Sequence, residues 1–340
     1  MRSPLVSVII PVFNGANFVS GALDSVRAQA GCDLEVITVD DGSTDDSPRL
    51  IAARGEAIRM RSQPNAGGGS ARNHGLAQSR GEYVWFLDQD DIAAPDMLAR
   101  QVDLLRRHGE DDVVIADGCE ADGDTIIDRH LLHPDIVARL QTAGADGVRL
   151  NIYRTLLRQQ PFKTLGQCLF RRSVLESLGP FSEDRRVVSD HEWFLRHAST
   201  GASVRFHARA LLTKRFHATS HSGTAEQRTV RYTGFILNSL LVQRARTPRR
   251  GDAQLEAAIR RAARKLALLC VVHAAGATAA ERNFATAAVR GARERMPEHT
   301  GLRWAEAWLR RGESSRAVTW LLKTGLRWKR RISGVQAIGS

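Results

Sequence analysis

Short runs rich in β-branched residues alternate with segments of helical periodicity from residue 5 to about residue 116. This alternation constrains the fold most, because strands separated by helix-length crossovers pair in parallel. The runs predict strands at residues 5–12, 34–40, 58–62, 82–87 and 112–116, with helices at 17–29, 44–53, 70–79 and 96–107. Ser43 is expected to cap the second of these helices. We therefore expect an α/β fold with one open, mostly parallel sheet and helices on both faces.

The next hundred residues are less regular. Residues 117–165 are polar, rich in Asp and interrupted by Gly before a helical stretch at 134–143, and we expect them to leave the sheet. Beyond them the sequence predicts a strand at 164–171, helices at 173–178 and 190–199, and a pair of strands within 204–216.

Composition changes near residue 225. Residues 1–225 hold 26 basic and 29 acidic side chains, whereas residues 226–340 hold 23 basic and 8 acidic ones. The second region has Arg, Ala and Leu at helical spacing, with an apolar stripe formed by Leu255, Ile259, Leu266 and Leu269. We expect two domains: an α/β domain at 1–225 and a basic, all-α region at 226–340.

Cysteine and glycine patterns disfavour several classes of protein. The four cysteines form no C-x-x-C pair, so neither a disulfide framework nor a structural zinc site is expected. The glycine run at 64–75 has Arg72 where a dinucleotide fingerprint needs its third glycine. No lysine precedes Lys163, so the run is not a P-loop. Dehydrogenases and P-loop hydrolases are therefore disfavoured.

The sequence shows neither a signal peptide nor a membrane-spanning segment. The apolar run at the start of the chain is short and typical of a strand. In the helical second region the longest uncharged stretch, 266–280, has 15 residues, whereas a spanning helix needs about 20. We expect a cytoplasmic protein that is either soluble or peripheral on the inner face of the cell membrane.

Carboxylates follow two of the predicted strands and begin a later helix. They are Asp40 and Asp41, then Asp88, Asp90 and Asp91, and finally Asp190 and Glu192. Ligands of open α/β sheets bind beyond the carboxyl ends of the strands. Carboxylates gathered there repel one another, and a cation such as Mg²⁺ or Mn²⁺ would relieve the repulsion and bind a diphosphate. For the D-x-D motif at 88–90 the alternative is an ordinary turn, which Asp also favours.

Six motifs occur in the order and spacing typical of one family. They are VSVIIPVFNG, VDDGSTDDS, PNAGGGSARNHGL, GEYVWFLDQDD, LFRRSVLESLGPFSE and SDHEWFLR. On these motifs, residues 4–222 resemble the family 2 inverting glycosyltransferases of the bacterial polysaccharide type. The resemblance implies the GT-A fold of nucleotide-diphospho-sugar transferases for the first domain.

The resemblance also implies which residues hold a nucleotide. They are Pro11 and Phe13 beside the base, Asp41 or Asp40 hydrogen-bonded to it, Arg72 near the diphosphate, and Asp88 at the ribose or the sugar. A divalent cation, Mg²⁺ or Mn²⁺, would be held by Asp90 and His217, and Asp190 would be the general base. For His217 the alternative is a solvated or core-edge histidine.

The implied reaction is a single displacement at the anomeric carbon, in which a base takes the proton of an acceptor hydroxyl. The chain departs from the family in having Ser189 where a Glu is common, a position that concerns the acceptor. His191 and Glu192 are interpreted as surface residues, and Cys168 as a small buried apolar residue.

The expected function is a metal-dependent hexosyl or N-acetylhexosaminyl transfer from a nucleotide sugar, UDP-linked in preference to GDP- or dTDP-linked. The expected acceptor is a hydroxyl of a glycan or lipid-linked molecule in cell-surface polysaccharide biosynthesis. The alternative is a catalytically silent protein of the same fold that binds sugar nucleotides or polysaccharide. Nucleic acid is not expected as a partner, because the first region is acidic and has no nucleic-acid-binding motif.

The C-terminal segment combines tryptophan with basic residues. Trp304, Trp308, Trp320 and Trp328 lie within the last 37 residues among eight Lys and Arg residues. Such a composition is typical of interfacial membrane contacts. The alternative is a helical hairpin that buries its tryptophans. The preference for Arg along the whole chain (44 Arg, 5 Lys) favours this alternative, because it explains the basic residues without a membrane contact. Both interpretations stay open.

Overall fold

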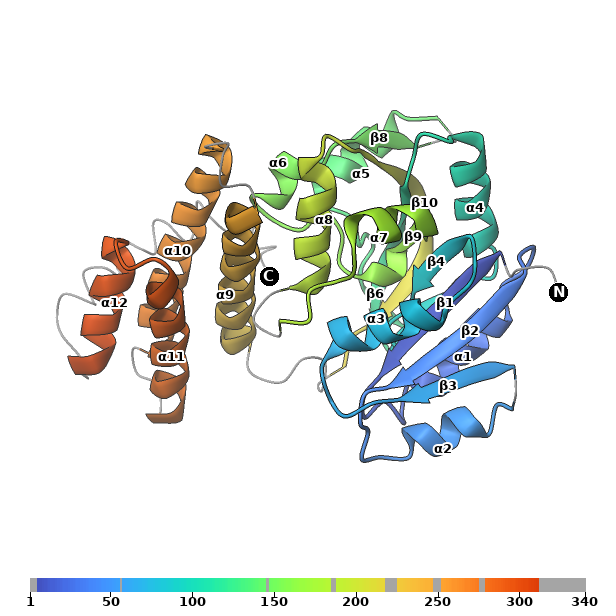
Figure 1. Ribbon diagram of the computed structural model, residues 1–340, viewed down its shortest axis with the longest axis horizontal. Coiled ribbons are helices and arrows are strands. Elements are labelled where there is room, and N and C mark those ends of the chain that lie inside the picture. Colours follow the sequence, from blue (N-terminus) through green and yellow to red (C-terminus); the bar gives the residue numbers. More distant parts are fainter. Residues whose placement is uncertain are drawn as a thin grey trace. The chain divides into compact units, whose positions relative to one another are not determined.

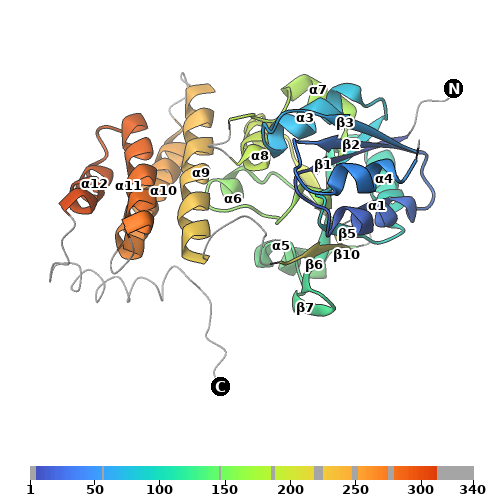
Figure 2. The same ribbon diagram turned by 90° about the horizontal axis from the view of Figure 1, so that it is seen from below.

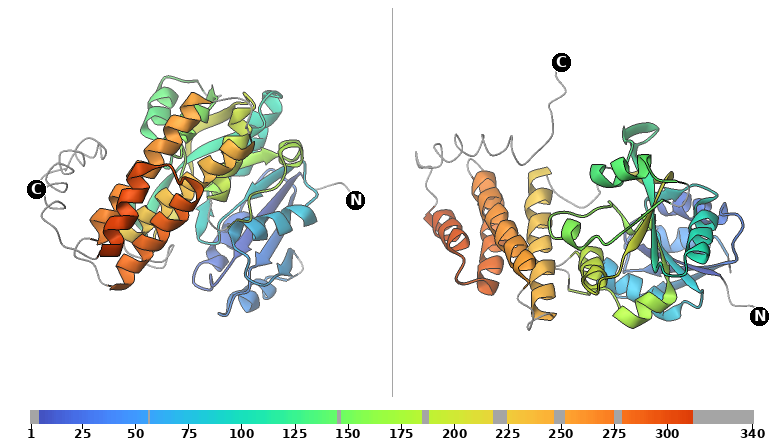
Figure 3. Two further views of the ribbon diagram at one scale, coloured as in Figure 1. Left: turned by 60° about the vertical axis from the view of Figure 1, so that its left-hand side comes forward. Right: turned by 90° about the horizontal axis from the view of Figure 1, so that it is seen from above.

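The structure is a computed structural model that describes residues 5–55, 57–144, 147–184, 188–217, 225–246, 252–274 and 279–311 (Figure 1). The chain divides into two compact units, Met1–Ser220 and His221–Ser340. The first unit contains the sheet. The described part of the second consists of helices (Figure 3).

A ten-stranded sheet forms the centre of the first unit, with the strand order β3-β2-β1-β4-β9-β6-β10-β5 (Figures 1 and 2). Six strands of this path run the same way, and β9 and β5 run the opposite way. Two further strands pair outside the path, β7 with β6 and β8 with β10. The bounds are β1 Val6–Val12, β2 Leu34–Asp40, β3 Ile58–Ser62, β4 Tyr83–Phe86, β5 Asp91–Ala93, β6 Val113–Asp122, β7 Thr125–Asp128, β8 Val148–Leu150, β9 Cys168–Arg171 and β10 Val204–Arg215.

Helices cover both faces of the sheet, as predicted. Alternate residues of β1 explain this arrangement, because Val8 and Ile10 join a core cluster with Val19 of α1 and Leu98 of α4. Ile9 points to the other face and packs so closely on α3 that a Cβ on Gly75 would lie 2.4 Å from Ile9 Cγ2. The helices are α1 Val19–Arg27, α2 Ser47–Ala52, α3 Gly68–Gln78, α4 Met97–Arg107, α5 Pro134–Gln141, α6 Tyr153–Leu156, α7 Arg172–Leu178 and α8 Ser189–Ser199.

The second half of the sheet differs from the prediction. Residues 117–165 do not simply leave the sheet, because β6 continues to Asp122 and both β7 and β8 lie in this segment. Residues 204–216 hold one strand, β10, and not two. Register shifts between His207 and Leu212 interrupt its pairing with β6. The strand is therefore irregular at the point where the sequence suggested a break between two strands. The strands β5, β7 and β8 were not predicted, since three or four residues are too few for a periodic signal.

The second unit contains α9 Ala225–Arg246, α10 Ala253–Ala274, α11 Ala279–Arg295 and α12 Thr300–Arg311. The helix α10 packs against the other three. It buries Leu255, Ile259 and Leu266 of the predicted stripe and leaves Leu269 half-buried. Trp304 is 47% exposed, whereas Trp320 and Trp328 lie outside the described residues. Among the helices in the described ranges, none has the length and hydropathy needed to span a membrane.

Candidate active site

The loops after β1 and β2 are hydrogen-bonded to each other at the carboxyl edge of the sheet. Successive backbone N–H groups of the first loop donate to side chains of the second: Asn14 to Ser43 Oγ (3.0 Å), Gly15 to Ser47 Oγ (2.8 Å) and Ala16 to Asp45 Oδ2 (2.9 Å). Asn14 has a φ of 48°, a left-handed conformation that Asn tolerates. The prediction that Ser43 caps α2 is wrong, because α2 begins four residues later and Ser43 serves the neighbouring loop.

Asp40 and Asp41 are buried where β2 ends. Asp41 accepts hydrogen bonds from Gln63 Nε2 and from the backbone N–H groups of Ala66 and Gly67, each at 2.8 Å. Asp40 Oδ1 accepts one from a backbone N–H at 3.1 Å. Asp41 therefore orders the glycine-rich loop that leads into α3.

Gln89, the middle residue of the D-x-D motif, joins the β4 loop to the β1 loop. Its side-chain amide accepts from the Phe13 N–H at 2.9 Å and donates to the Phe13 carbonyl at 3.1 Å. It also fills the space beside Gly15, where a Cβ would lie 2.2 Å from Gln89 Oε1. Pro11 is half-buried and Phe13 is 46% exposed, so an aromatic ring stands open at this edge.

Arg72 of α3 and Asp88 form an ion pair with an N–O distance of 2.7 Å. Thr164 Oγ1 lies 2.9 Å from Asp88 Oδ2 and 3.0 Å from Asp91 Oδ2, and one hydroxyl proton serves only one of them at a time. Burial, and then the charges of Asp88 and Asp90, raise the pKa of Asp91 well above its ordinary value. Burial also opposes ionisation of Asp88, but Arg72 outweighs it and lowers the pKa of Asp88. Asp88 is therefore the anion of the pair, and Asp91 keeps its proton more readily.

A buried polar scaffold fixes the position of Thr164. Trp85 Nε1 donates to the Gly166 carbonyl at 2.8 Å. The fully buried Gln167 accepts from the N–H groups of Lys163 and Thr164 at 2.9 and 3.2 Å, and it donates to a backbone carbonyl of β6 at 2.9 Å. This scaffold holds the 3₁₀ turn at Leu165–Gln167 against the end of β4.

His217 lies beside Asp90, although 127 positions separate them in the sequence. The distance from His217 Nε2 to Asp90 Oδ2 is 2.9 Å, and the imidazole stacks on Phe18 with 4.1 Å between ring centroids. Arg215 donates to the backbone carbonyls of Asp90 and Phe18 at 2.5 and 2.9 Å, which ties the end of β10 to both loops. A carboxylate oxygen and an imidazole nitrogen, both partly exposed, form a donor set that fits Mg²⁺ or Mn²⁺.

Asn73 connects α3 to the segment that leads into α8. Its side chain accepts from the Phe181 N–H and donates to the Phe181 carbonyl, both at 2.9 Å. A Cβ on Gly69 would lie 3.4 Å from Ser189 Cβ, so the start of α8 packs against the start of α3. The first turn of α8 therefore lies at the same edge as Arg72.

Asp190 stands in this first turn and is half-buried. Its Oδ2 accepts a hydrogen bond of 2.6 Å from Gln160 Nε2, and its Oδ1 accepts from the following backbone N–H at 2.8 Å. Both bonds fix the orientation of the Asp190 carboxylate.

The interpretation of His191 and Glu192 as surface residues is wrong, because both are fully buried. His191 Nε2 lies 2.9 Å from the Leu156 carbonyl, and burial lowers the pKa of the imidazole. Glu192 forms an ion pair with Arg196 at 3.0 Å. Most of α8 is buried, although the polar residues of its first turn suggest an exposed helix. Cys168 is fully buried, as predicted.

Gln89, Asn73, Thr164 and Gln160 were not among the predicted site residues. The first two lie inside the quoted motifs, which is a signal that could have been followed. Thr164 and Gln160 have no local signal, because their partners are 76 and 30 positions away.

A second acidic group, His108 with Glu110 and Asp111, also has ligand atoms close together. Asp111 is bonded to Arg149 at 2.6 Å and ion-paired with Arg205, and these guanidinium groups disfavour a cation. The group precedes β6, whereas Asp88 follows β4, a strand of the same direction. It therefore lies at the opposite edge of the sheet.

Sequence comparison with known proteins agrees with the described geometry. The family model described as "Glycosyl transferase family 2" matches residues 7–179. An uncharacterized glycosyltransferase of Rickettsia typhi is 30% identical over 239 residues, which are 69% of this chain and 72% of that protein. The uncharacterized glycosyltransferase EpsJ of Bacillus subtilis is 32% identical over 201 residues, which are 55% and 54% of the two chains.

Two solved structures resemble this chain along most of its length. TarS 1–349 of S. aureus in complex with UDP-GlcNAc has a TM-score of 0.56 and 16% identity, covering 92% of this chain and 93% of that one. The mannosyltransferase PcManGT from Pyrobaculum calidifontis, in complex with GDP-Man and Mn²⁺, has a TM-score of 0.51 and 20% identity, covering 90% and 86%. These likenesses confirm the predicted GT-A fold.

Proposed function

Because the chain belongs to glycosyl transferase family 2, we propose that it is a metal-dependent enzyme that uses a UDP-linked sugar and glycosylates a hydroxyl of a glycan or lipid-linked acceptor. A role in cell-surface polysaccharide biosynthesis is part of the proposal. The observation that supports it most is the contact of 2.9 Å between Asp90 and His217, next to the ion pair of Arg72 and Asp88. A carboxylate, an imidazole and a guanidinium at one strand edge suit a diphosphate with its cation.

The donor would bind across the linked loops after β1 and β2. Pro11 and the exposed ring of Phe13 would flank the nucleotide base. Asp40 or Asp41 would accept a hydrogen bond from an N–H group of the base. Arg72 would contact the diphosphate. Asp88 is held anionic by its ion pair with Arg72, and it would accept hydrogen bonds from hydroxyl groups of the ribose or the sugar.

Asp90 and His217 would hold Mg²⁺ or Mn²⁺, which supplies positive charge for the departing nucleoside diphosphate. Asp190 would take the proton from the acceptor hydroxyl, whose oxygen attacks the anomeric carbon as the bond to the diphosphate oxygen breaks. The leaving nucleoside diphosphate keeps that electron pair, and the configuration at the anomeric carbon inverts. Gln160 would hold the Asp190 carboxylate in its orientation.

Calorimetric titration with UDP and with GDP, each in Mn²⁺ and in a chelator, tests the donor assignment. We expect UDP to bind more tightly than GDP, and each nucleotide to bind at least tenfold more weakly in the chelator than in Mn²⁺. Both nucleotides are included because TarS was solved with UDP-GlcNAc and PcManGT with GDP-Man. A protein that binds neither nucleotide would refute the proposal. Hydrolysis of a panel of nucleotide sugars then separates an enzyme from the catalytically silent alternative.

We also propose that the basic helical region attaches the protein peripherally to the inner face of the membrane. Basic residues near an anionic bilayer contribute about 1 kcal/mol each before screening. We expect flotation with anionic liposomes at low salt, less at high salt, and markedly less for a chain ending after Arg311, which lacks Trp320, Trp328 and six of the basic residues. Equal flotation of both chains, or none of either, would refute this attachment.

A further inference from the structure

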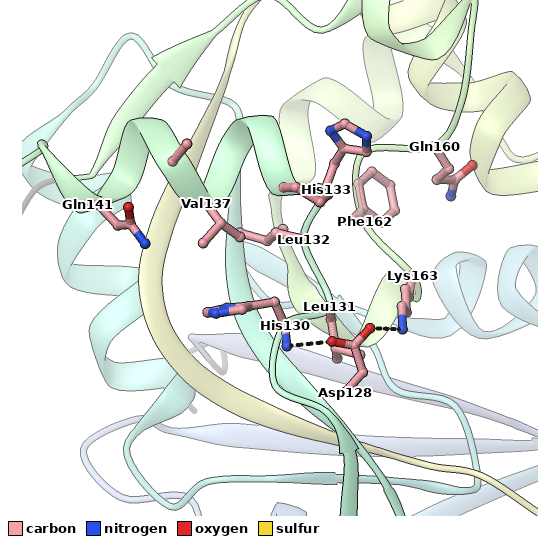
Figure 4. A pocket seen from close by; sticks show the side chains of 12 residues that line it. Asp128, His130, Leu131, Leu132, His133, Val137, Gln141, Gln160, Phe162 and Lys163 are labelled. Carbon is pink, nitrogen blue, oxygen red and sulfur yellow. Dashed lines mark hydrogen bonds and ion pairs between the residues drawn. The ribbon is translucent and has the colours of Figure 1, made fainter. Parts of the chain in front are cut away.

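A pocket of about 540 Å³ lies between the end of β7, the helix α5 and the segment 160–163 (Figure 4). We name it the Val137 pocket. Figure 4 shows Val137, Leu132 and Phe162 on its wall. Six of its twelve lining residues are apolar: Leu131, Leu132, Pro134, Val137, Ala138 and Phe162. None of these residues belongs to the donor site described above.

The Val137 pocket adjoins the proposed base. Gln160 lines the pocket, and its Nε2 is the atom that donates to Asp190 Oδ2 at 2.6 Å. Phe162, on the pocket wall, packs edge-on against Phe194 of α8, with 4.7 Å between centroids. The helix that presents Asp190 therefore rests on the wall of this pocket. A molecule bound there would contact Gln160, the residue whose side chain holds the Asp190 carboxylate.

The charged groups of the pocket are already paired. Lys163 Nζ lies 2.7 Å from both Glu120 and Asp128, and His130 Nδ1 lies 2.6 Å from Asp117 Oδ2. An anionic ligand would have to displace these partners, which disfavours a phosphate at this point. A neutral ligand with an apolar part matches the lining better.

Apolar surface continues outside the pocket. Ile126 and Ile127 are each 52% exposed on β7, the strand whose last residue, Asp128, lines the pocket. Figure 2 shows this hairpin projecting from the first unit. Adjacent strand residues point to opposite faces, so the hairpin offers an isoleucine on each side. An apolar chain leaving the pocket would find further apolar contact there.

We propose that the Val137 pocket is the acceptor subsite, and that the acceptor is a neutral sugar carried on an apolar chain. The assignment rests on the proposed function, since an acceptor implies transfer. Asp190 receives the proton of the hydroxyl that the pocket holds toward it.

The test uses hexyl and methyl β-D-glucosides as probes and measures their binding to the full chain by saturation-transfer NMR. We expect the hexyl glycoside to bind at least tenfold more tightly than the methyl one, because each buried methylene adds to the affinity. V137W would fill the pocket and weaken hexyl glucoside binding at least tenfold while leaving UDP affinity within twofold. R139W is the matched control, because Arg139 is an exposed residue of the same helix outside the pocket, and it should bind like the wild type.

A second variant needs no change in the core. Replacing both exposed isoleucines, I126S/I127S, should weaken binding of decyl β-D-glucoside about threefold and leave binding of the methyl glucoside unchanged. Equal binding of the hexyl and methyl probes, or unchanged hexyl binding in V137W, would overturn the proposal. Failure of this proposal can be distinguished from failure of the proposed function, because glucoside binding can be measured even if the wild-type protein binds no nucleotide.

Discussion

The first unit contains two halves that are built differently: residues 5–93, which we call the donor half after the proposal above, and residues 113–199, which we call the acceptor half. In the donor half, functional side chains follow the ends of parallel strands, and bonds between neighbouring loops hold them. In the acceptor half, Asp190 depends on Gln160, and Thr164 depends on a turn that Trp85 anchors from 81 positions away. Strand topology therefore fixes the donor half, whereas a few distant polar contacts fix the acceptor half. Bonds of Thr164 to Asp88 and of Asn73 to Phe181 join the two halves at the site.

The largest expected effect comes from removing the proposed base in the acceptor half. Asp190→Asn should lower the rate of transfer by about 10²–10⁴-fold, because it removes the base. UDP affinity should stay within twofold of the wild type, since the base acts on the acceptor. Steady-state transfer and calorimetry on the same preparation measure both. An equal loss of nucleotide binding would contradict this division of roles.

The reciprocal change in the donor half is Asp90→Asn. We expect UDP affinity in Mn²⁺ to fall at least tenfold, because a cation ligand loses its charge. Affinity in a chelator should not change. His217→Gln serves as the companion variant and should act in the same direction with a smaller effect, since it removes a neutral ligand. Loss of binding in the chelator as well would show that Asp90 has a different role.

Packing offers a comparison between the two units. A Cβ on Gly75 would lie 2.4 Å from Ile9 Cγ2, so Gly75→Ala should reduce the free energy of unfolding of the first unit by about 1–3 kcal/mol. A Cβ on Gly291 of α11 would meet no atom within 4 Å, and Gly291→Ala should instead stabilise its helix by about 0.5–1 kcal/mol. Denaturant unfolding of both variants measures the difference, and the same sign in both would refute the packing argument.

The smallest expected effect concerns His191. Burial lowers the pKa of its imidazole, so the unfolded chain takes up a proton at a higher pH than the folded chain does. Stability should therefore fall as the pH drops below the ordinary histidine value, by at most about 1.4 kcal/mol per pH unit from this one group. His191→Asn should lessen that decline between pH 7.5 and pH 5.5. Identical pH profiles of unfolding in the two proteins would exclude this contribution.

Prediction from sequence succeeded where the signal was local. The strands at 34–40 and 58–62 have their predicted bounds, because the β-branched run of the first and the apolar–polar alternation of the second are local patterns. The juxtaposition of Asp90 with His217 came from a family resemblance, since no periodicity joins positions 127 apart. The short strand β7, the burial of Glu192 and the placement of Thr164 escaped prediction, because each depends on tertiary contacts that leave no mark on neighbouring residues.

The bond of Gln89 to Phe13 has a consequence for binding. One amide side chain engages both backbone polar groups of Phe13 and so joins the loop beside the base to the loop that bears Asp88 and Asp90. A ligand that orders one loop lowers the entropy cost of ordering the other. For the proposed nucleotide and cation, such cooperativity would be reciprocal: whatever factor the nucleotide adds to the affinity for the cation, the cation would add to the affinity for the nucleotide.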